Sequence, residues 1–253
     1  MTTEPDMSDR TTMVVGASRG LGRGIAQALA EAGMPVIAVA RTEAALEQLA
    51  GESEAIRFEV ADAADPVVAG ALLDRHEPRT LVLVAGATPL MRPLAQQTWE
   101  TFSVNWQTDV RLAFGWLREV LLKPLAPGSR VIVVTSGAAV AGSPLSGGYA
   151  GAKATVRFIT AYARDEASRS GLGISFTAVL PRLTPATGLG RPAVKAYAAR
   201  NRMTEDEYVA AAGPPLTPEI AGAAALELAQ ADTETLAAEY LLSGGGLKAL
   251  GDP

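Results

Sequence analysis

The chain alternates short apolar segments with longer amphipathic ones along nearly its whole length. TLVLVAGA, residues 80–87, has no polar residue at its centre, which is typical of a strand buried on both faces. Strands separated by helical segments form parallel sheets, because parallel neighbours need a crossover connection. We therefore predict an α/β fold in one domain: a Rossmann-type, doubly wound, mostly parallel sheet of about seven strands, with helices on both faces.

The expected elements follow from apolar periodicity and from glycine and proline breaks. The predicted strands cover residues 11–18, 34–41, 55–62, 80–87, 129–138, 173–181 and 237–246. The predicted helices cover residues 20–33, 42–51, 65–76, 98–122, 149–170 and 217–230. Asp65 before Pro66 predicts an N-cap with proline at the first helical position.

The domain is expected to span residues 11–253. Residues 1–10 are expected to form a flexible N-terminal tail, and they contain no hydrophobic segment like that of a signal peptide. One irregular region, at about 184–215, is predicted to form a lid over the substrate, because long connections of this kind are usually functional. Its basic cluster comprises Arg191, Lys195, Arg200 and Arg202. We favour a solvent-exposed helix for these residues; the alternative is a basic wall that faces an anionic substrate.

The composition excludes several classes of function. A net charge of −5 and a pI near 5.1 argue against non-specific binding to nucleic acid or to an anionic membrane. Cysteine is absent, which excludes disulfides and thiolate nucleophiles, and a cytoplasmic location is expected. The one histidine, His76, ends a predicted helix and is expected to be structural, so no metal site is predicted.

The glycines of VVGASRGLGRG point to a dinucleotide. Gly16, Gly20 and Gly22 lie between the first strand and the first helix, where a tight turn brings the backbone and a helix N-terminus to a pyrophosphate. A glycine pattern alone is weak evidence, but here strand and helix flank it as the binding requires.

The end of the second strand predicts which dinucleotide binds. An acidic residue there would bond the ribose hydroxyls, whereas this chain has Arg41 and Thr42, with Ser18 and Arg19 in the glycine turn. Guanidinium groups match the geometry of a 2′-phosphate, so we expect NADP(H) to be preferred over NAD(H). In the alternative interpretation, Arg41 is only a surface residue at a strand end.

GGYAGAK places Tyr149 four residues before Lys153, on one face of a helix. An ammonium near a phenol favours the phenolate, so the pair could act as an acid/base group. The same spacing also occurs in ordinary amphipathic helices.

Together these motifs resemble the short-chain dehydrogenase/reductase family, in its compact form of about this length, over essentially the whole chain. Asn105 in FSVNW matches the family's helix asparagine, and Ser136 precedes Tyr149 by the family's usual thirteen residues. The resemblance implies that the catalytic residues are Asn105, Ser136, Tyr149 and Lys153. It implies that the cofactor is held by Gly16, Ser18, Arg19, Gly20, Leu21, Gly22, Arg41, Thr42, Asp62, Ala63, Ala85, Gly86, Tyr149, Lys153, Pro181 and Thr184.

The resemblance also implies the chemistry. The nicotinamide would exchange a hydride with a carbonyl or alcohol substrate while Tyr149 acts as general acid/base. Lys153 would hold the pKa of the phenol down, Ser136 would donate to the carbonyl oxygen, and Asn105 would help to hold a relay water. Predicted helices 98–122 and 149–170 resemble the family's subunit contacts, which implies a homotetramer or homodimer.

Departures from the family pattern at three places in the chain bear on function. The family's N-N-A-G is Leu83, Val84, Ala85 and Gly86, so both asparagines are missing, and Arg182 replaces a glycine. Ala186 stands at the usual threonine position, between Thr184 and Thr187, and Ser243 replaces an aspartate. These changes keep open a dinucleotide-binding sensor or partner subunit with little turnover. An epimerase or dehydratase is less favoured, because such relatives are usually longer.

Overall fold

The computed structural model describes residues 11–250, and within that range all strands join one eight-stranded sheet. The spatial order is β3-β2-β1-β4-β5-β6-β7-β8. The strands are β1 (Thr12–Val15), β2 (Val36–Ala40), β3 (Ile56–Val60), β4 (Thr80–Leu83), β5 (Arg130–Val134), β6 (Ser175–Pro181), β7 (Glu239–Ser243) and β8 (Gly246–Ala249). The order reverses between β1 and β4, which is the switch point where ligands bind in doubly wound sheets. The predicted fold class is confirmed.

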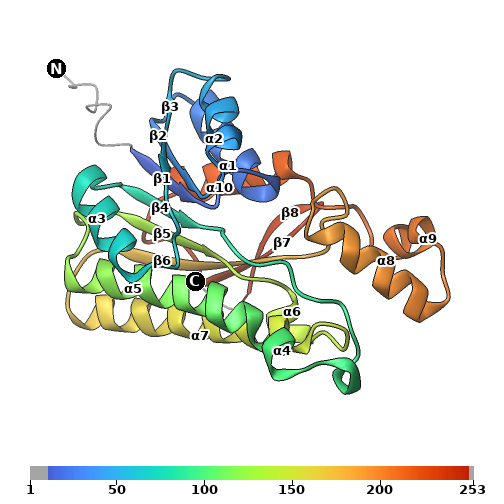
Figure 1. Ribbon diagram of the computed structural model, residues 1–253. Coiled ribbons are helices and arrows are strands. Elements are labelled where there is room, and N and C mark those ends of the chain that lie inside the picture. Colours follow the sequence, from blue (N-terminus) through green and yellow to red (C-terminus); the bar gives the residue numbers. More distant parts are fainter. Residues whose placement is uncertain (1–10, 251–253) are drawn as a thin grey trace.

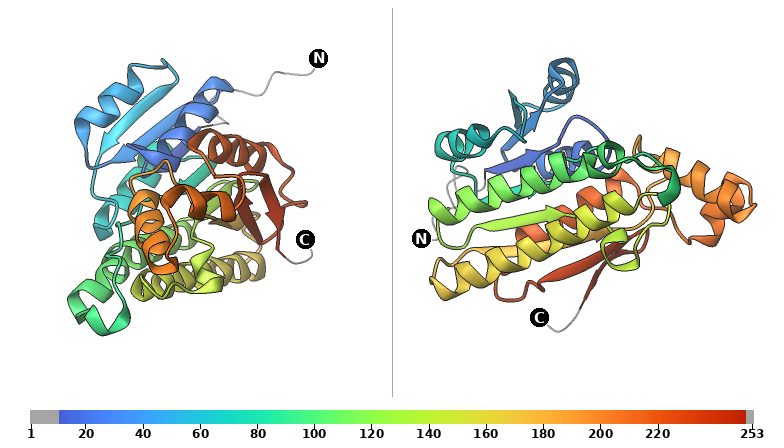
Figure 2. Two further views of the ribbon diagram at one scale, coloured as in Figure 1. Left: turned by 90° about the vertical axis from the view of Figure 1, so that its right-hand side faces the viewer. Right: turned by 60° about the horizontal axis from the view of Figure 1, so that its bottom comes forward.

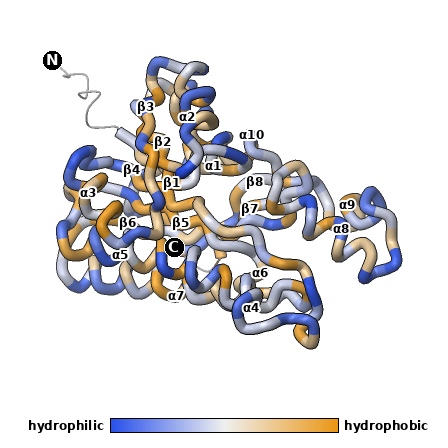
Figure 3. The backbone as a smooth tube through the Cα atoms, in the orientation of Figure 1, coloured by the Kyte–Doolittle hydropathy of each residue, from blue (hydrophilic) through white to orange (hydrophobic). Residues whose placement is uncertain are grey.

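Helices cover both faces of this sheet (Figure 1). The first face carries α1 (Gly20–Glu31), α2 (Glu43–Ala50) and α10 (Pro218–Gln230). The second carries α3 (Pro66–His76), α5 (Arg111–Leu122) and α7 (Gly147–Arg169). Alternate residues of a strand belong to opposite faces: Val14 packs in the first core, whereas Met13 and Val15 pack in the second. The apolar centre of the sheet is visible in Figure 3.

The last strand differs from its expected form. The predicted strand 237–246 is β7, which pairs in parallel with β6, followed by a turn and β8, which pairs with β7 in antiparallel fashion. The turn is possible because Gly246 adopts a φ of 89°, in the region that glycine tolerates best. The glycine run that we expected to end a strand therefore reverses the chain.

The predicted helix 98–122 is divided in two. It begins at Thr98, which caps α4 (Trp99–Asn105), but a π-helical turn at Trp106–Val110 separates α4 from α5. Such turns insert an extra residue and often occur at functional sites. Here the turn holds Asp109, which is buried.

The predicted lid is helical rather than irregular. It contains α8 (Gly190–Asn201) and α9 (Glu205–Ala211), which project together beyond the sheet in Figures 1 and 2. Arg202, with a φ of 56°, ends α8, and Thr204 forms a capping box that starts α9. The sequence pattern did not reveal these two short helices, because glycine and proline residues near both ends of the region are typical of irregular structure.

Several smaller predictions can be placed. The expected tail, residues 1–10, lies outside the described residues. The side chain of Asp65 accepts a hydrogen bond from the Val67 amide, which confirms the N-cap. His76 Nε2 lies 2.8 Å from Glu59 Oε1 in a structural contact. No helix within residues 11–250 has the length and apolarity to cross a bilayer.

Candidate active site

A cavity of about 1230 Å³ opens at the carboxyl ends of the parallel strands. Its wall includes Arg41 just after β2, Ala85 after β4, Ser136 after β5 and Pro181 at the end of β6. In parallel sheets the carboxyl ends of the strands and their loops form the usual binding crevice. The cavity is therefore the candidate active site.

The predicted site residues, distant in sequence, meet in this cavity. The residues that line it include Gly16, Ser18, Arg19, Gly20, Leu21, Gly22, Arg41, Thr42, Asp62, Ala63, Ala85, Gly86, Ser136, Tyr149, Lys153, Pro181 and Thr184. Asn105 is the exception, since it is buried behind the wall.

The glycine turn brings β1 against β4 and leaves room for a ligand. Gly16 has a φ of 105°, and a Cβ built on it would lie 2.5 Å from the Ala85 amide nitrogen. A larger residue would therefore push β1 and β4 apart. The turn leads into α1 at Gly20, whose N-terminal amides and dipole suit a pyrophosphate, so the residues present fit a dinucleotide.

Thr187 lies near Gly20 of the glycine turn, a proximity that the sequence did not single out. Its side chain lies 3.6 Å from the position of a Cβ on Gly20, and its Oγ1 lies 2.9 Å from Thr184 Oγ1. Both threonines line the cavity, whereas Ala186, at the family's usual threonine position, is exposed and outside the lining. Thr184 and Thr187 thus place two hydroxyl groups on either side of the position where the family usually has one threonine.

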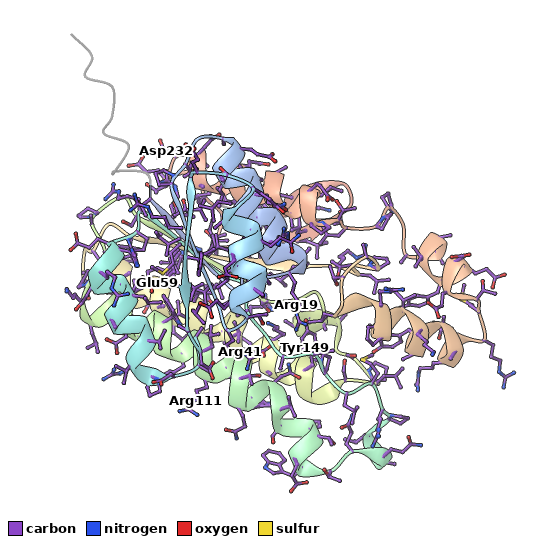
Figure 4. All side chains as sticks on the ribbon, turned by 45° about the horizontal axis from the view of Figure 1, so that its top comes forward. Arg19, Arg41, Glu59, Arg111, Tyr149 and Asp232 are labelled. Carbon is purple, nitrogen blue, oxygen red and sulfur yellow. The ribbon has the colours of Figure 1, made fainter. Side chains whose placement is uncertain are left out.

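Arg19 and Arg41 have exposed side chains at the β2 end of the cavity, on the side of the molecule where Tyr149 is labelled in Figure 4. Within residues 11–250 neither guanidinium forms an ion pair. Thr42 precedes α2 without capping it through its side chain. Two cations and a hydroxyl are thus available to an anionic ligand here.

Tyr149 and Lys153 lie one turn apart on α7, as predicted. Lys153 Nζ lies 5.7 Å from the centre of the Tyr149 ring. Thr135 Oγ1, at the end of β5, donates to the Lys153 carbonyl at 2.9 Å and so ties the helix to the sheet. Ser136 follows Thr135, and its Oγ accepts a hydrogen bond from the Ala138 amide at 3.2 Å.

Lys153 is paired with a carboxylate that the sequence did not single out. Its Nζ lies 3.1 Å from Asp109 Oδ2, and the two side chains are 7% and 1% exposed. Burial alone would lower the pKa of Lys153, but the Asp109 carboxylate and, to a smaller extent, Tyr149 outweigh it, so this pKa lies above its ordinary value. The ammonium is therefore stable in a buried position.

Asn105 is buried behind the cavity wall, where it bonds to the backbone and to Asp109. Its Nδ2 donates to the Ala87 carbonyl oxygen at 2.8 Å and lies 3.3 Å from Asp109 Oδ2. Its helix, α4, approaches α7 closely because Gly148 has no side chain: a Cβ there would lie 1.9 Å from the Phe102 carbonyl oxygen. The close contact brings the asparagine and lysine helices together.

Arg182 occupies the position of a family glycine without the backbone conformation that requires glycine. Among the described residues, the non-glycine residues with positive φ are Glu77 and Arg202. The Arg182 amide donates to the Leu242 carbonyl oxygen at 2.8 Å, and its exposed side chain lines the cavity. The substitution is therefore compatible with the backbone seen here.

Aromatic and small side chains of the predicted lid line one part of the cavity. Tyr197 of α8 and Tyr208 of α9 stack with ring centres 6.1 Å apart. The Tyr197 hydroxyl is hydrogen bonded to Ser143 Oγ. All four residues of the basic cluster are exposed and absent from the described lining, which contradicts the basic wall and agrees with the solvated helix that we favoured.

The chain is similar in sequence to known proteins. The family model for short chain dehydrogenases matches residues 10–198. D-erythrulose reductase of Gallus gallus is 34% identical over 136 residues, which cover 51% of this chain and 55% of that protein. L-xylulose reductase of Mesocricetus auratus is 31% identical over 105 residues, or 42% of this chain and 43% of that protein. The matched segments thus span about half the length of these two relatives.

A longer match is with 3-oxoacyl-[acyl-carrier-protein] reductase of Synechocystis sp., which is 30% identical over 188 residues, covering 69% of this chain and 74% of that protein. Among solved structures, a variant of actinorhodin polyketide ketoreductase with NADPH superimposes with a TM-score of 0.80, covering 96% of this chain and 98% of that one. Its sequence identity of 21% makes this a likeness of fold.

Proposed function

This chain belongs to the short chain dehydrogenase family, and on that premise we propose that it is an NADP(H)-dependent oxidoreductase acting on a carbonyl or alcohol group. The observation that carries the proposal is that Ser136, Tyr149 and Lys153 line the same cavity as the glycine turn. A hydride donor held by the turn and a proton donor on α7 would then face one substrate.

In the proposed reaction, bound NADPH supplies the hydride that reduces the substrate carbonyl. Tyr149 donates its phenolic proton to the carbonyl oxygen, and Ser136 donates a hydrogen bond to the same oxygen as charge develops on it. Lys153, one turn along the helix, favours loss of the tyrosine proton through its positive charge. In the direction of alcohol oxidation, the phenolate of Tyr149 accepts the proton of the alcohol.

The preference for NADP(H) is supported by the two arginines at the β2 end. Arg41 and Arg19 have no ion-pair partner among residues 11–250, and a guanidinium binds phosphate oxygens with two parallel hydrogen bonds. Asp62 farther along the cavity, with its Oδ1 accepting from the Ala64 amide at 3.1 Å, would face the adenine.

The substrate that the lid supports best is a neutral carbonyl compound with an apolar or aromatic portion. Tyr197, Tyr208 and Val209 line the lid side of the cavity, and the basic residues of α8 point elsewhere. Arg182, on the β6 side of the cavity, is a cation available there to an anionic substrate.

We also propose a homo-oligomer, either a dimer or a tetramer, built on α5 and α7. Phe114, Phe158 and Tyr162 on these helices are 58%, 53% and 60% exposed, and the last two rings stack on each other. Large apolar side chains gathered on one surface usually mark an interface. The cytoplasmic location expected from composition stays a prediction.

A sensor or partner subunit with little turnover remains the alternative, and three features weigh against it. Although the family's two asparagines after β4 are missing, the backbone there is still held by polar side chains: Asp109 accepts from the Ala87 amide and Asn105 donates to the Ala87 carbonyl oxygen. Arg182 needs no glycine-only conformation. Ser136, Tyr149 and Lys153 line the cavity as well, and a protein that only binds the dinucleotide would not need this set of side chains.

The test follows NADPH absorbance with a panel of neutral ketones, aldehydes and anionic oxo-compounds, using wild type and Tyr149→Phe. We expect reduction of at least one neutral carbonyl by wild type and loss of that activity in the variant. Tight NADPH binding without reduction of any carbonyl would favour the sensor, and full activity of Tyr149→Phe would refute the mechanism.

A further inference from the structure

The buried carboxylate of Asp109 is surrounded by hydrogen-bond donors from three segments of the chain. Oδ2 lies 3.1 Å from Lys153 Nζ and 3.3 Å from Asn105 Nδ2. Oδ1 accepts from the Ala87 amide at 2.8 Å and from Thr108 Oγ1 at 2.9 Å. A buried carboxylate is tolerated only when it is bonded in this way.

Two local features let Asp109 reach this position. The π-helical turn at Trp106–Val110 holds it between α4 and α5, facing inward. Gly86 supplies the space, because a Cβ built on Gly86 would lie 2.9 Å from Asp109 Oδ2. The carboxylate thus lies against the end of β4, where the resemblance led us to expect two asparagines and the chain has apolar residues instead.

The ion pair between Asp109 and Lys153 also fixes the position of the Lys153 ammonium. Among residues 11–250, the titratable groups that act on Lys153 are Asp109, from the π-helical turn, and Tyr149, from its own helix. Without a carboxylate, a buried ammonium is strongly disfavoured, and the lysine tends to lose its proton. Among residues 11–250, Asp109 is the carboxylate that pairs with Lys153.

We propose that Asp109 is a positioning residue of the active site, which fixes Lys153 Nζ beside Tyr149 and keeps Lys153 charged across neutral and moderately alkaline pH. The order of groups is then carboxylate, ammonium and phenol, running from the core to the cavity. The effect on Lys153 is independent of any turnover. The effect on rate rests on the proposed oxidoreductase function.

The direct test is a titration of the lysine side chains by NMR, with ¹³C-labelled lysine and without substrate. The chain has Lys123, Lys153, Lys195 and Lys248, so the Lys153 signal is assigned by its loss in Lys153→Arg. In Asp109→Asn we expect Lys153 to titrate about 1 to 3 pH units lower than in wild type. An unchanged midpoint would overturn the proposal.

The matched control is Glu239→Gln. Glu239 also pairs with a partly buried cation, since its carboxylate accepts two 2.7 Å hydrogen bonds from Arg157, but it lies outside the cavity. This variant should leave the Lys153 midpoint unchanged. If Asp109→Asn does not fold, the titration of wild type alone still tests the inference. Lys153 must then titrate at a higher pH than exposed Lys195, and a lower midpoint for Lys153 would contradict the inference.

A second measurement addresses the rate. In the pH profile of kcat/KM for carbonyl reduction, Asp109→Asn should move the alkaline limb to lower pH, and Asp109→Glu, which keeps the charge, should move it back toward wild type. A loss of rate at every pH with an unshifted limb would mean that Asp109 serves only as structural support. If wild type reduces no carbonyl, the NMR titration still tests Asp109, and only the proposed function has failed.

Discussion

The hydroxyl of Tyr197, in α8 of the predicted lid, is hydrogen bonded to Ser143 Oγ in the loop that precedes α7. The same hydroxyl lies 3.5 Å from the Leu145 amide. The projecting lid is thus attached at its inner side to the segment that leads to Tyr149. This attachment connects the placement of the lid with the geometry of the candidate active site.

We predict that Tyr197→Phe weakens the binding of the carbonyl substrate more than that of the cofactor. One lost neutral hydrogen bond corresponds to a rise in KM of about 3- to 10-fold. The Kd for NADPH, measured by fluorescence titration, should stay within about 2-fold of wild type. Tyr240→Phe is the matched control, because its hydroxyl accepts a 2.9 Å bond from the Ala237 amide far from the lid.

Tyr149→Phe should reduce kcat by about 10²- to 10⁴-fold, since it removes the general acid while keeping the ring. The substitution leaves the Gly16 turn and both arginines intact, so NADPH should still bind. Stopped-flow or steady-state absorbance at saturating cofactor measures the first effect, and fluorescence titration the second. A variant that loses both properties together would indicate misfolding rather than lost proton transfer.

Arg41→Asp should reverse the cofactor preference. An aspartate at this position repels a 2′-phosphate and can bond the ribose hydroxyls, so kcat/KM should fall for NADPH and rise for NADH. Arg57→Asp makes the same charge change at an exposed site on edge strand β3, outside the cavity, and should leave the ratio unaltered. If both variants change the ratio equally, long-range charge rather than Arg41 sets the preference.

The buried ion pair between Asp109 and Lys153 predicts that substitutions of the two residues have strongly non-additive effects on the free energy of unfolding. Asp109→Asn leaves an ammonium without its counter-charge and Lys153→Met leaves a carboxylate, and each loss costs about 3 to 5 kcal/mol. The double variant should lose less than the sum of the two, as measured by urea unfolding at pH 7. The partly exposed Arg157–Glu239 pair should show a coupling of about 1 kcal/mol or less.

The pH dependence of that coupling has a definite sign. Because the pKa of Lys153 is raised in the folded protein, the folded state binds its proton more tightly than the unfolded chain does. The stabilisation is therefore complete below the ordinary lysine pKa of about 10.4 and is lost as pH rises through the raised value. Unfolding at pH 7, 9 and 11 tests this directly: a coupling that weakens between pH 7 and 9 would contradict it.

Phe158→Asp should dissociate the proposed oligomer. The substitution places a charge beside exposed Tyr162 on α7, where a hydrophobic contact with another copy is expected. Light scattering coupled to size exclusion should show a lower mass than for wild type. Val67→Asp adds the same charge at a side chain that is 73% exposed on α3 and should leave the mass unchanged. A monomeric wild type would refute the proposal at once.

The fold was largely predictable because its signals are local. The strand TLVL is buried on both faces, as its continuous apolar run indicates, and Asp65 caps α3, as its place before Pro66 indicates. The extra strand β8 and the π-helical turn were missed, because a glycine turn and a one-residue insertion in a helix leave the apolar pattern almost unchanged.

The candidate site was predictable in part. Gly16, Ser136, Tyr149 and Lys153 lie in one cavity, as the motifs and the family resemblance led us to expect. Asp109 was missed, although it lies only four residues after Asn105. Nothing in WQTDV distinguishes a buried carboxylate from the many exposed ones of an acidic chain.

The sequence by itself determined the order of strands and helices, the glycine turn and the helical spacing of Tyr149 and Lys153, since each depends on residues close together in the chain. The tertiary structure decided which carboxylate faces Lys153, where the lid attaches and which way its basic residues point. Those features depend on contacts such as Asp109 with Ala87 and Tyr197 with Ser143. Such contacts join segments far apart in sequence, and only packing brings them within hydrogen-bonding distance.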